Sequence, residues 1–159
     1  MAKARPIPGF ADSASFREAA ARAVEVRAEE VFEHADHVLD VADIERVHDM
    51  RVATRRLRAA LEIFAVCFAK SEHRRVLKEV KALADALGER RDPDVAIDGF
   101  ARVRDALPQG DRSGINHLID ELRAQQAGAN ESLAAAIERI RAEGLHERLT
   151  ALTAEVRPA

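Results

Sequence analysis

The sequence has no tryptophan and no tyrosine, and its 159 residues include only six phenylalanines, seven glycines, five prolines and one cysteine. With so few aromatic side chains, a hydrophobic core must be built mainly from aliphatic ones. A single cysteine excludes an internal disulfide framework and a cysteine-based zinc site. No run approaches 18 apolar residues, so a membrane-spanning helix is not expected. The first nine residues lack the apolar segment of a signal peptide, and we therefore expect a cytoplasmic protein.

The residues that are abundant favour helices. The chain contains 32 alanines and 21 arginines but only four lysines, and alanine, leucine, arginine and glutamate are strong helix formers. An apolar fraction of 47% with a net charge of −3 argues against disorder. Short connections between the expected helices favour antiparallel neighbours. We predict an all-α fold, an antiparallel up-and-down bundle of long helices, in one domain at 14–157 that follows an extended N-terminal arm at 1–13.

The spacing of apolar residues predicts six helices. Ser15 and Glu18 form a capping-box pattern that opens the first helix. Gly88 is predicted to stop the third helix, and Asp92-Pro93 to open the fourth as N-cap and first helical residue. Gly144 separates the last two helices. The predicted helices cover about 16–38, 44–69, 71–87, 93–107, 115–143 and 145–156.

Charge is distributed unevenly along the chain. The segment from Arg46 to Arg91 contains 12 basic and six acidic residues, whereas the remainder contains 13 basic and 22 acidic ones. The segment therefore has a net charge of +6 in a protein that is weakly acidic overall. Such an arrangement indicates a localised anion-binding site rather than general affinity for polyanions.

One face of the second predicted helix concentrates this positive charge. At about 100° per residue, His48, Arg51, Arg55 and Arg58 form a stripe about 80° wide, on the side opposite the apolar residues. No matching row of carboxylates is apparent along this helix, so the four side chains repel one another unless an anion covers them. A row of guanidinium groups is typical of a phosphate-binding surface, because each can donate two parallel hydrogen bonds to an oxyanion.

The next part of the chain can extend this stripe. Antiparallel packing around a turn near Lys70 would place Arg58 level with Lys81, and Arg51 level with two arginines further along. The basic residues that would join the surface in this way are Arg74, Lys78, Lys81, Arg90 and Arg91. The same spacing is equally well explained by solvated helix faces whose charge is balanced by acids on neighbouring helices.

Two segments resemble a known family. Val47–Arg58 closely resembles the signature of CHAD domains, the conserved histidine α-helical domains, in which arginine follows a histidine at +3 and basic residues follow near +7 and +10. Leu87–Val95 resembles a second family element, a Leu-Gly turn followed by Arg-Asp-x-Asp-Val. The resemblance implies an all-helical domain that binds inorganic polyphosphate, often on polyphosphate granules, without catalytic chemistry of its own. By this resemblance, four residues correspond to the basic motif: His48, Arg51, Arg55 and Arg58. Lys78 and Lys81 correspond to basic positions of the following helix.

The chain departs from the family pattern in two respects. Pro93 stands where the family usually has an aliphatic residue. A full family domain also has two helical lobes, each with a His/Arg/Lys helix, which face each other across a basic pore, and this chain has one such helix. It therefore resembles the first lobe alone. A two-fold homodimer could supply the second basic helix.

The predicted function is non-catalytic binding of inorganic polyphosphate, or of a similar linear polyanion, with no cofactor, no metal ion and no membrane contact. Nucleic-acid binding is disfavoured by the lack of aromatic residues for stacking and by a pI near 6.1. A helical adaptor that docks an acidic protein is a further alternative. A phosphohydrolase is disfavoured because no carboxylate cluster for Mg²⁺ is evident. His34 and His37, spaced i and i+3, are interpreted as surface residues rather than metal ligands.

Overall fold

The computed structural model describes residues 3–8 and 15–156, and in these residues it contains helices and no strands. The all-α prediction is therefore confirmed. Residues 1–2 and 9–13 of the predicted arm lie outside the described part. The helices are α1 (Phe16–Ala35), α2 (Ile44–Ile63), α3 (Lys70–Ala106), α4 (Ser113–Ala142) and α5 (Leu145–Ala154), with short 3-10 helices at Ala65–Cys67 and Gln109–Asp111.

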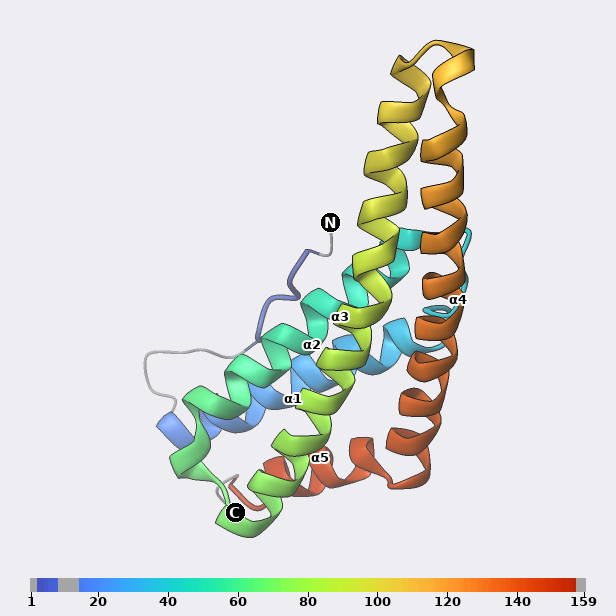
Figure 1. Cartoon of the computed structure of the whole chain (residues 1–159). Coiled ribbons are helices and arrows are strands. Elements are labelled where there is room, and N and C mark those ends of the chain that lie inside the picture. The colour runs from blue at the N-terminus through green and yellow to red at the C-terminus, as the bar shows by residue number, and fades with distance from the viewer. Residues whose placement is uncertain (1–2, 9–14, 157–159) are drawn as a thin grey trace.

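The longest helices, α3 and α4, form an antiparallel hairpin that extends well beyond the rest of the molecule (Figure 1). α1 and α2 pack side by side across one half of this hairpin, and α5 closes its lower end. The core between them is aliphatic, as the composition requires, and its fully buried members include Val24, Met50, Leu57, Leu83 and Leu149. None of the described helices is sufficiently long and apolar to cross a membrane.

Two predicted helix ends are confirmed in atomic detail. Ser15 Oγ accepts a hydrogen bond from the Glu18 backbone N–H at 3.2 Å, and the Glu18 carboxylate accepts one from the Ser15 N–H at 2.7 Å. These hydrogen bonds lower the pKa of Glu18. Gly144 has a φ of 64° and lies between α4 and α5. That left-handed conformation is strained for residues with a side chain, which explains the helix boundary.

The second helix is shorter than predicted, because α2 ends at Ile63 and a 3-10 helix replaces its last turn. Phe64 leaves the helical path and its ring packs against Phe16, with centroids 5.1 Å apart. The buried His73 ring forms a 2.8 Å hydrogen bond with the Leu61 carbonyl oxygen. A side chain from α3 thus satisfies one of the carbonyl groups that the end of α2 leaves without a helical partner.

The third and fourth predicted helices are in fact one continuous helix, so the predicted break at Gly88 and Asp92-Pro93 is wrong. Gly144 is the glycine with positive φ in the described residues, and Gly88 keeps a helical conformation. Pro93 lies inside α3, where it removes a backbone hydrogen bond. Relative to alanine, a glycine and a proline in a helix disfavour it by about 1 and 3 kcal/mol. This cost is offset by packing, because three side chains of this stretch of α3 are buried in the molecule: Leu87, Arg90 and Pro93.

None of the other described helices covers the far half of the α3–α4 hairpin (Figure 1). Phe100 and Val103, two large apolar residues of this half of α3, are 36% and 49% exposed. Ile119 of α4 is buried there, and Leu107 is half-buried. α4 therefore covers only part of the apolar surface of this half of α3.

Candidate anion-binding site

The basic stripe of α2 is positioned by the opposite face of the same helix. Asp43 caps α2 by accepting a hydrogen bond from the Glu45 N–H at 3.3 Å. Four apolar side chains of the helix are buried, which turns the other face outward: Val47, Met50, Leu57 and Leu61. Within the described part of the chain, His48, Arg51 and Arg55 form neither an ion pair nor a side-chain hydrogen bond. Three polar groups of the predicted stripe therefore have open donor positions.

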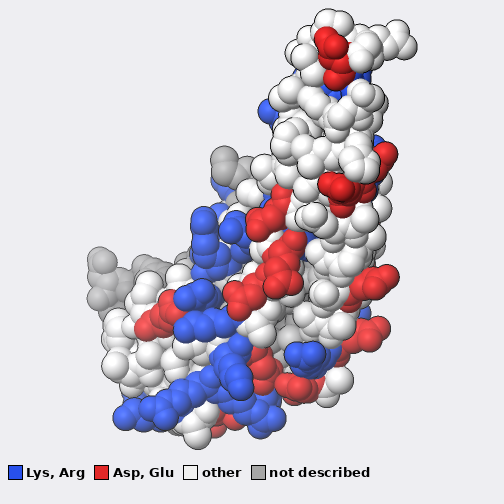
Figure 2. Space-filling view, in the orientation of Figure 1, with Lys and Arg blue, Asp and Glu red and all other residues white. Residues whose placement is uncertain are grey.

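An open groove of about 490 Å³ lies between this stripe and α3. One wall is basic and consists of Arg51, Arg55 and Arg58. The other wall belongs to α3 and includes Ala84 and Gly88 together with three carboxylates: Asp85, Glu89 and Asp92. Figure 2 shows the two signs side by side, with blue side chains over α2 and the lower part of α3 and red ones further up α3. No ion pair joins the two walls in the residues that the structure describes.

The acidic wall corrects one expectation from the sequence. No row of carboxylates is found along α2, but a row on α3 stands across the groove from the arginines. Its three members are spaced i, i+4 and i+7, which is itself a recognisable one-face pattern on a helix. The antiparallel register around Lys70 places Glu89 level with Arg51 and Asp85 level with Arg55. The register was predictable, but the residues that face the groove are the acids and not the neighbouring arginines.

At the lower end of the stripe, Glu62 links the two helices. Its Oε1 atom lies 3.1 Å from Arg58 Nε and 3.2 Å from Lys81 Nζ. The hydrogen bonds from Arg58 and Lys81 lower the pKa of Glu62. The predicted proximity of Arg58 and Lys81 is therefore confirmed, although a carboxylate occupies the space between them. All three side chains remain 42% exposed.

Arg90 is not available to a ligand, which corrects its place among the predicted phosphate-binding residues. Its side chain is fully buried, forms an ion pair with Asp94 and donates from Nε to Asn130 Oδ1 at 3.0 Å. Gln126 donates to Asp94 Oδ1 at 2.6 Å, and Asn130 donates to the Leu39 carbonyl oxygen at 3.2 Å. Arg90 therefore belongs to a buried polar network that ties α3 to α4 and to the loop before α2.

Arg91 is also occupied within the molecule. Its guanidinium group donates to the Ile44 carbonyl oxygen at 2.9 Å and lies 3.5 Å from Glu45 Oε1. Its side chain is only 17% exposed. Arg91 thus fastens the first turn of α2 to α3, and we do not retain it as a phosphate contact.

The remaining predicted basic residues lie on the first half of α3. Arg74 and Lys78 are exposed, and within the described chain neither has an ion-pair partner. They share one helix face with Lys81. Together with the α2 residues they form what we call the basic surface: His48, Arg51, Arg55, Arg58, Arg74, Lys78 and Lys81.

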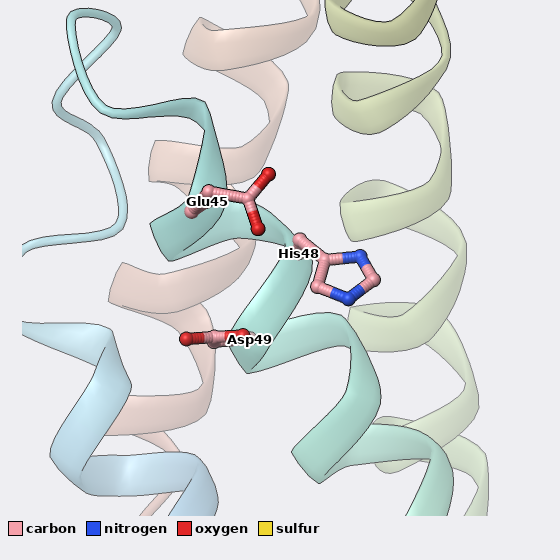
Figure 3. A group of neighbouring side chains, drawn as sticks. All are labelled: Glu45, His48 and Asp49. Carbon is pink, nitrogen blue, oxygen red and sulfur yellow. The ribbon is translucent and has the colours of Figure 1, made fainter. Parts of the chain in front are cut away.

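Glu45, His48 and Asp49 form a small group at the start of α2 that sequence reasoning did not single out. One potential ligand atom from each lies within 4.8 Å of the others. Their i, i+3 and i+4 spacing on one helix is the signal that could have identified them. In Figure 3 the His48 ring and the Asp49 carboxylate extend in different directions from the helix. Because Glu45 also contacts Arg91, the group is poorly arranged to enclose a cation.

Comparison with known proteins identifies relatives of the chain. It is 39% identical over 92 residues to the uncharacterized protein Rv2226 of Mycobacterium tuberculosis strain H37Rv, and 38% identical over 92 residues to the uncharacterized protein MT2285 of strain CDC 1551. In both cases the match covers 56% of this chain and 18% of the relative, so the chain corresponds to a small part of these proteins. No solved structure matches it significantly.

The family model described as the CHAD domain matches residues 22–159, which is most of the chain. That range contains both elements singled out in the sequence: the His48 motif, which lines the groove, and the Leu87–Val95 segment, which holds the buried Arg90–Asp94 pair. The chain belongs to the CHAD domain family.

Proposed function

We propose that this protein binds inorganic polyphosphate, without catalysing its conversion, along the basic surface of α2 and the first half of α3. The observation that carries the proposal is the row of donors on α2, where Arg51 and Arg55 extend into an open groove and no carboxylate of the described residues lies within ion-pair distance of them. Membership in the CHAD family supports it, because the family is associated with polyphosphate binding and its members are generally non-catalytic. We also propose a cytoplasmic location with association to polyphosphate granules.

The spacing of the arginines suits a linear, repeating anion. Arg51, Arg55 and Arg58 are distributed over about 10 Å of helix, at 1.5 Å per residue. Each guanidinium group can donate two hydrogen bonds to the terminal oxygens of a phosphate unit. Successive units of one chain could therefore contact successive arginines. A compact anion such as a single phosphate would use only one of them.

The acidic wall of the groove sets a limit on affinity. Asp85, Glu89 and Asp92 repel a polyanion that fills the groove, so we expect the chain to lie toward α2. Because binding releases counterions, affinity should fall steeply with salt, with a log–log slope that scales with the number of phosphates neutralised. This rule was established for nucleic acids and applies to polyphosphate by analogy.

Calorimetric titration with long-chain polyphosphate, single-stranded DNA and duplex DNA, at equal phosphate concentration, tests the proposal. We expect polyphosphate to bind most tightly. Arg55→Ala should weaken it by about 1.5–3 kcal/mol, the range for hydrogen bonds to charged groups. Arg123→Ala is the matched control, because Arg123 is an exposed arginine on α4 that pairs with Asp120. Equal losses in the two variants would show that the stripe is not the site.

One observation favours a competing function. A groove with three cations on one wall and three carboxylates on the other also suits a protein segment of mixed charge, which a helical adaptor would dock. Such an adaptor would bind polyphosphate weakly and would lose its docking affinity when Asp85 or Glu89 is neutralised. Polyphosphate binding should instead become tighter in the same variants.

A further inference from the structure

A second hollow, of about 340 Å³, lies on the other side of α3, between α3 and α4. Arg75 and Lys78 reach it from α3, and Arg139 reaches it from the last part of α4. Lys78 also belongs to the basic surface, so the hollow adjoins that surface. Arg139 lies outside the basic segment Arg46–Arg91 and is not part of either family motif.

The charges around this hollow are not balanced. Two carboxylates line it, Glu79 and Glu143. Glu79 forms an ion pair with Arg148 and lies 3.9 Å from Arg75 Nε, so its charge is already neutralised. Lys78 and Arg139 have no ion-pair partner in the described part of the chain. Glu143 offsets one of these two charges, so the hollow retains a small excess of positive charge.

The exposed face of α3 changes sign along its length. Its first half carries Arg74, Lys78 and Lys81, and its next turns carry Asp85, Glu89 and Asp92 on nearly the same face, as the i, i+4 and i+7 spacing requires. Figure 2 shows the same division, with blue at the lower part of α3 and red above it. A polyanion that reaches the Arg58 end of the α2 stripe is repelled by the upper part of α3 and attracted by its lower part.

We infer that the polyanion path turns where Arg58 meets Lys81, follows the first half of α3 and ends at Arg139 on α4. This inference rests on the proposed function and names a binding residue outside the family motif. The α2 section from Arg51 to Arg58 and the α3 section from Arg74 to Lys81 each span about 10 Å. A long polyphosphate chain could occupy both sections and reach Arg139. Tripolyphosphate, with only three units, is too short to do so from the α2 stripe.

The test compares long-chain polyphosphate with tripolyphosphate in calorimetric titrations of the full chain. Arg139→Gln should weaken long-chain binding by about three- to tenfold, since the contact is charged but solvent-exposed. It should also reduce the salt slope by about one. The dissociation constant for tripolyphosphate should change less than about twofold in Arg139→Gln. Arg123→Gln, the same substitution on the same helix but on the distant part of the hairpin, should leave both ligands unaffected.

The outcomes separate this inference from the proposed function. Arg55→Gln should weaken both ligands, because the α2 stripe serves both. If Arg55→Gln weakens binding while Arg139→Gln behaves like Arg123→Gln, the extension to α4 is wrong and the proposed function stands. If Arg139→Gln weakens long-chain binding while Arg55→Gln does not, the proposal that the α2 stripe binds polyphosphate is wrong, and so is a path that begins there. Arg139 is exposed and has no ion-pair partner among the described residues, so circular dichroism should show an unchanged fold in that variant.

Discussion

Neutralising Glu62 should increase the affinity for polyphosphate, because this carboxylate competes with the ligand for two cations. Its oxygen lies 3.1 Å from Arg58 Nε and 3.2 Å from Lys81 Nζ. With all three side chains 42% exposed, each pair is a surface ion pair worth about 0.2–1 kcal/mol. Glu62→Gln releases both cations, so the gain is about 0.4–2 kcal/mol, or roughly two- to thirtyfold in the dissociation constant.

The sign of this effect makes the experiment informative. Losing two surface pairs lowers the free energy of unfolding by a similar small amount, so affinity and stability should move in opposite directions. Titration calorimetry measures the first and urea unfolding the second. Asp120→Asn on α4 is the control, since it removes one exposed carboxylate that also pairs with an arginine. If Glu62→Gln binds no more tightly than Asp120→Asn while the fold is intact, Arg58 and Lys81 do not contact the ligand.

Acid pH provides a second readout for the same carboxylate. The hydrogen bonds from Arg58 and Lys81 lower the pKa of Glu62 in the folded protein. Its stabilising contribution is therefore complete above the usual glutamate range, near 4.3, and is lost as the pH falls through the lowered value. The affinity advantage of Glu62→Gln over the wild type should disappear over the same interval, because the wild-type carboxylate then becomes neutral as well.

Four further predictions concern the rest of the molecule. Arg90→Met should lower the free energy of unfolding by about 3–5 kcal/mol, because it leaves Asp94 buried without its partner; a loss below about 1 kcal/mol in urea titration would contradict this. Pro93→Ala should raise the free energy of unfolding by about 1–3 kcal/mol in urea titration, because it restores a backbone donor inside α3; an unchanged or lower value would show that packing of the buried ring outweighs that hydrogen bond. His48→Ala should weaken polyphosphate binding in titration calorimetry, because it removes a hydrogen-bond donor at one end of the α2 stripe; an unchanged affinity would assign His48 a packing role. Light scattering should detect a two-fold homodimer when polyphosphate is added, whereas a monomeric mass with and without ligand, at one chain per protein, would exclude a shared pore.

Local chemistry made some parts of the fold predictable and left others open. The capping box at Ser15 and the helix boundary at Gly144 are decided by neighbouring residues, and both appear as predicted. The break at Gly88 and Pro93 was expected from the same local rules, yet α3 continues through it. Helix propensities of a few kcal/mol do not determine whether a helix ends in a segment whose side chains are buried against another helix. A short stretch of sequence does not show which helix will pack against it.

The candidate site shows a similar division. The spacing of His48, Arg51 and Arg55 on one helix face follows from helical geometry alone, and the register of α2 against α3 follows from a short antiparallel connection. What the sequence did not reveal is the rotation of α3 about its own axis. That rotation turns Glu89 toward the groove and Arg90 into the core, although the two residues are adjacent in the chain.

The two family motifs consequently have different physical roles. The motif around His48 provides the exposed cations, while the Leu87–Val95 segment provides a buried anchor that need not touch a ligand. With Arg90 and Asp94 locked between α3 and α4, Glu89 and Asp92 can only face α2, at about 100° per residue. The anchor thereby places carboxylates opposite the arginines and confines positive potential to the lower half of the surface. In the proposed path, the helix rotation that buries Arg90 also directs a polyanion along α3 toward α4.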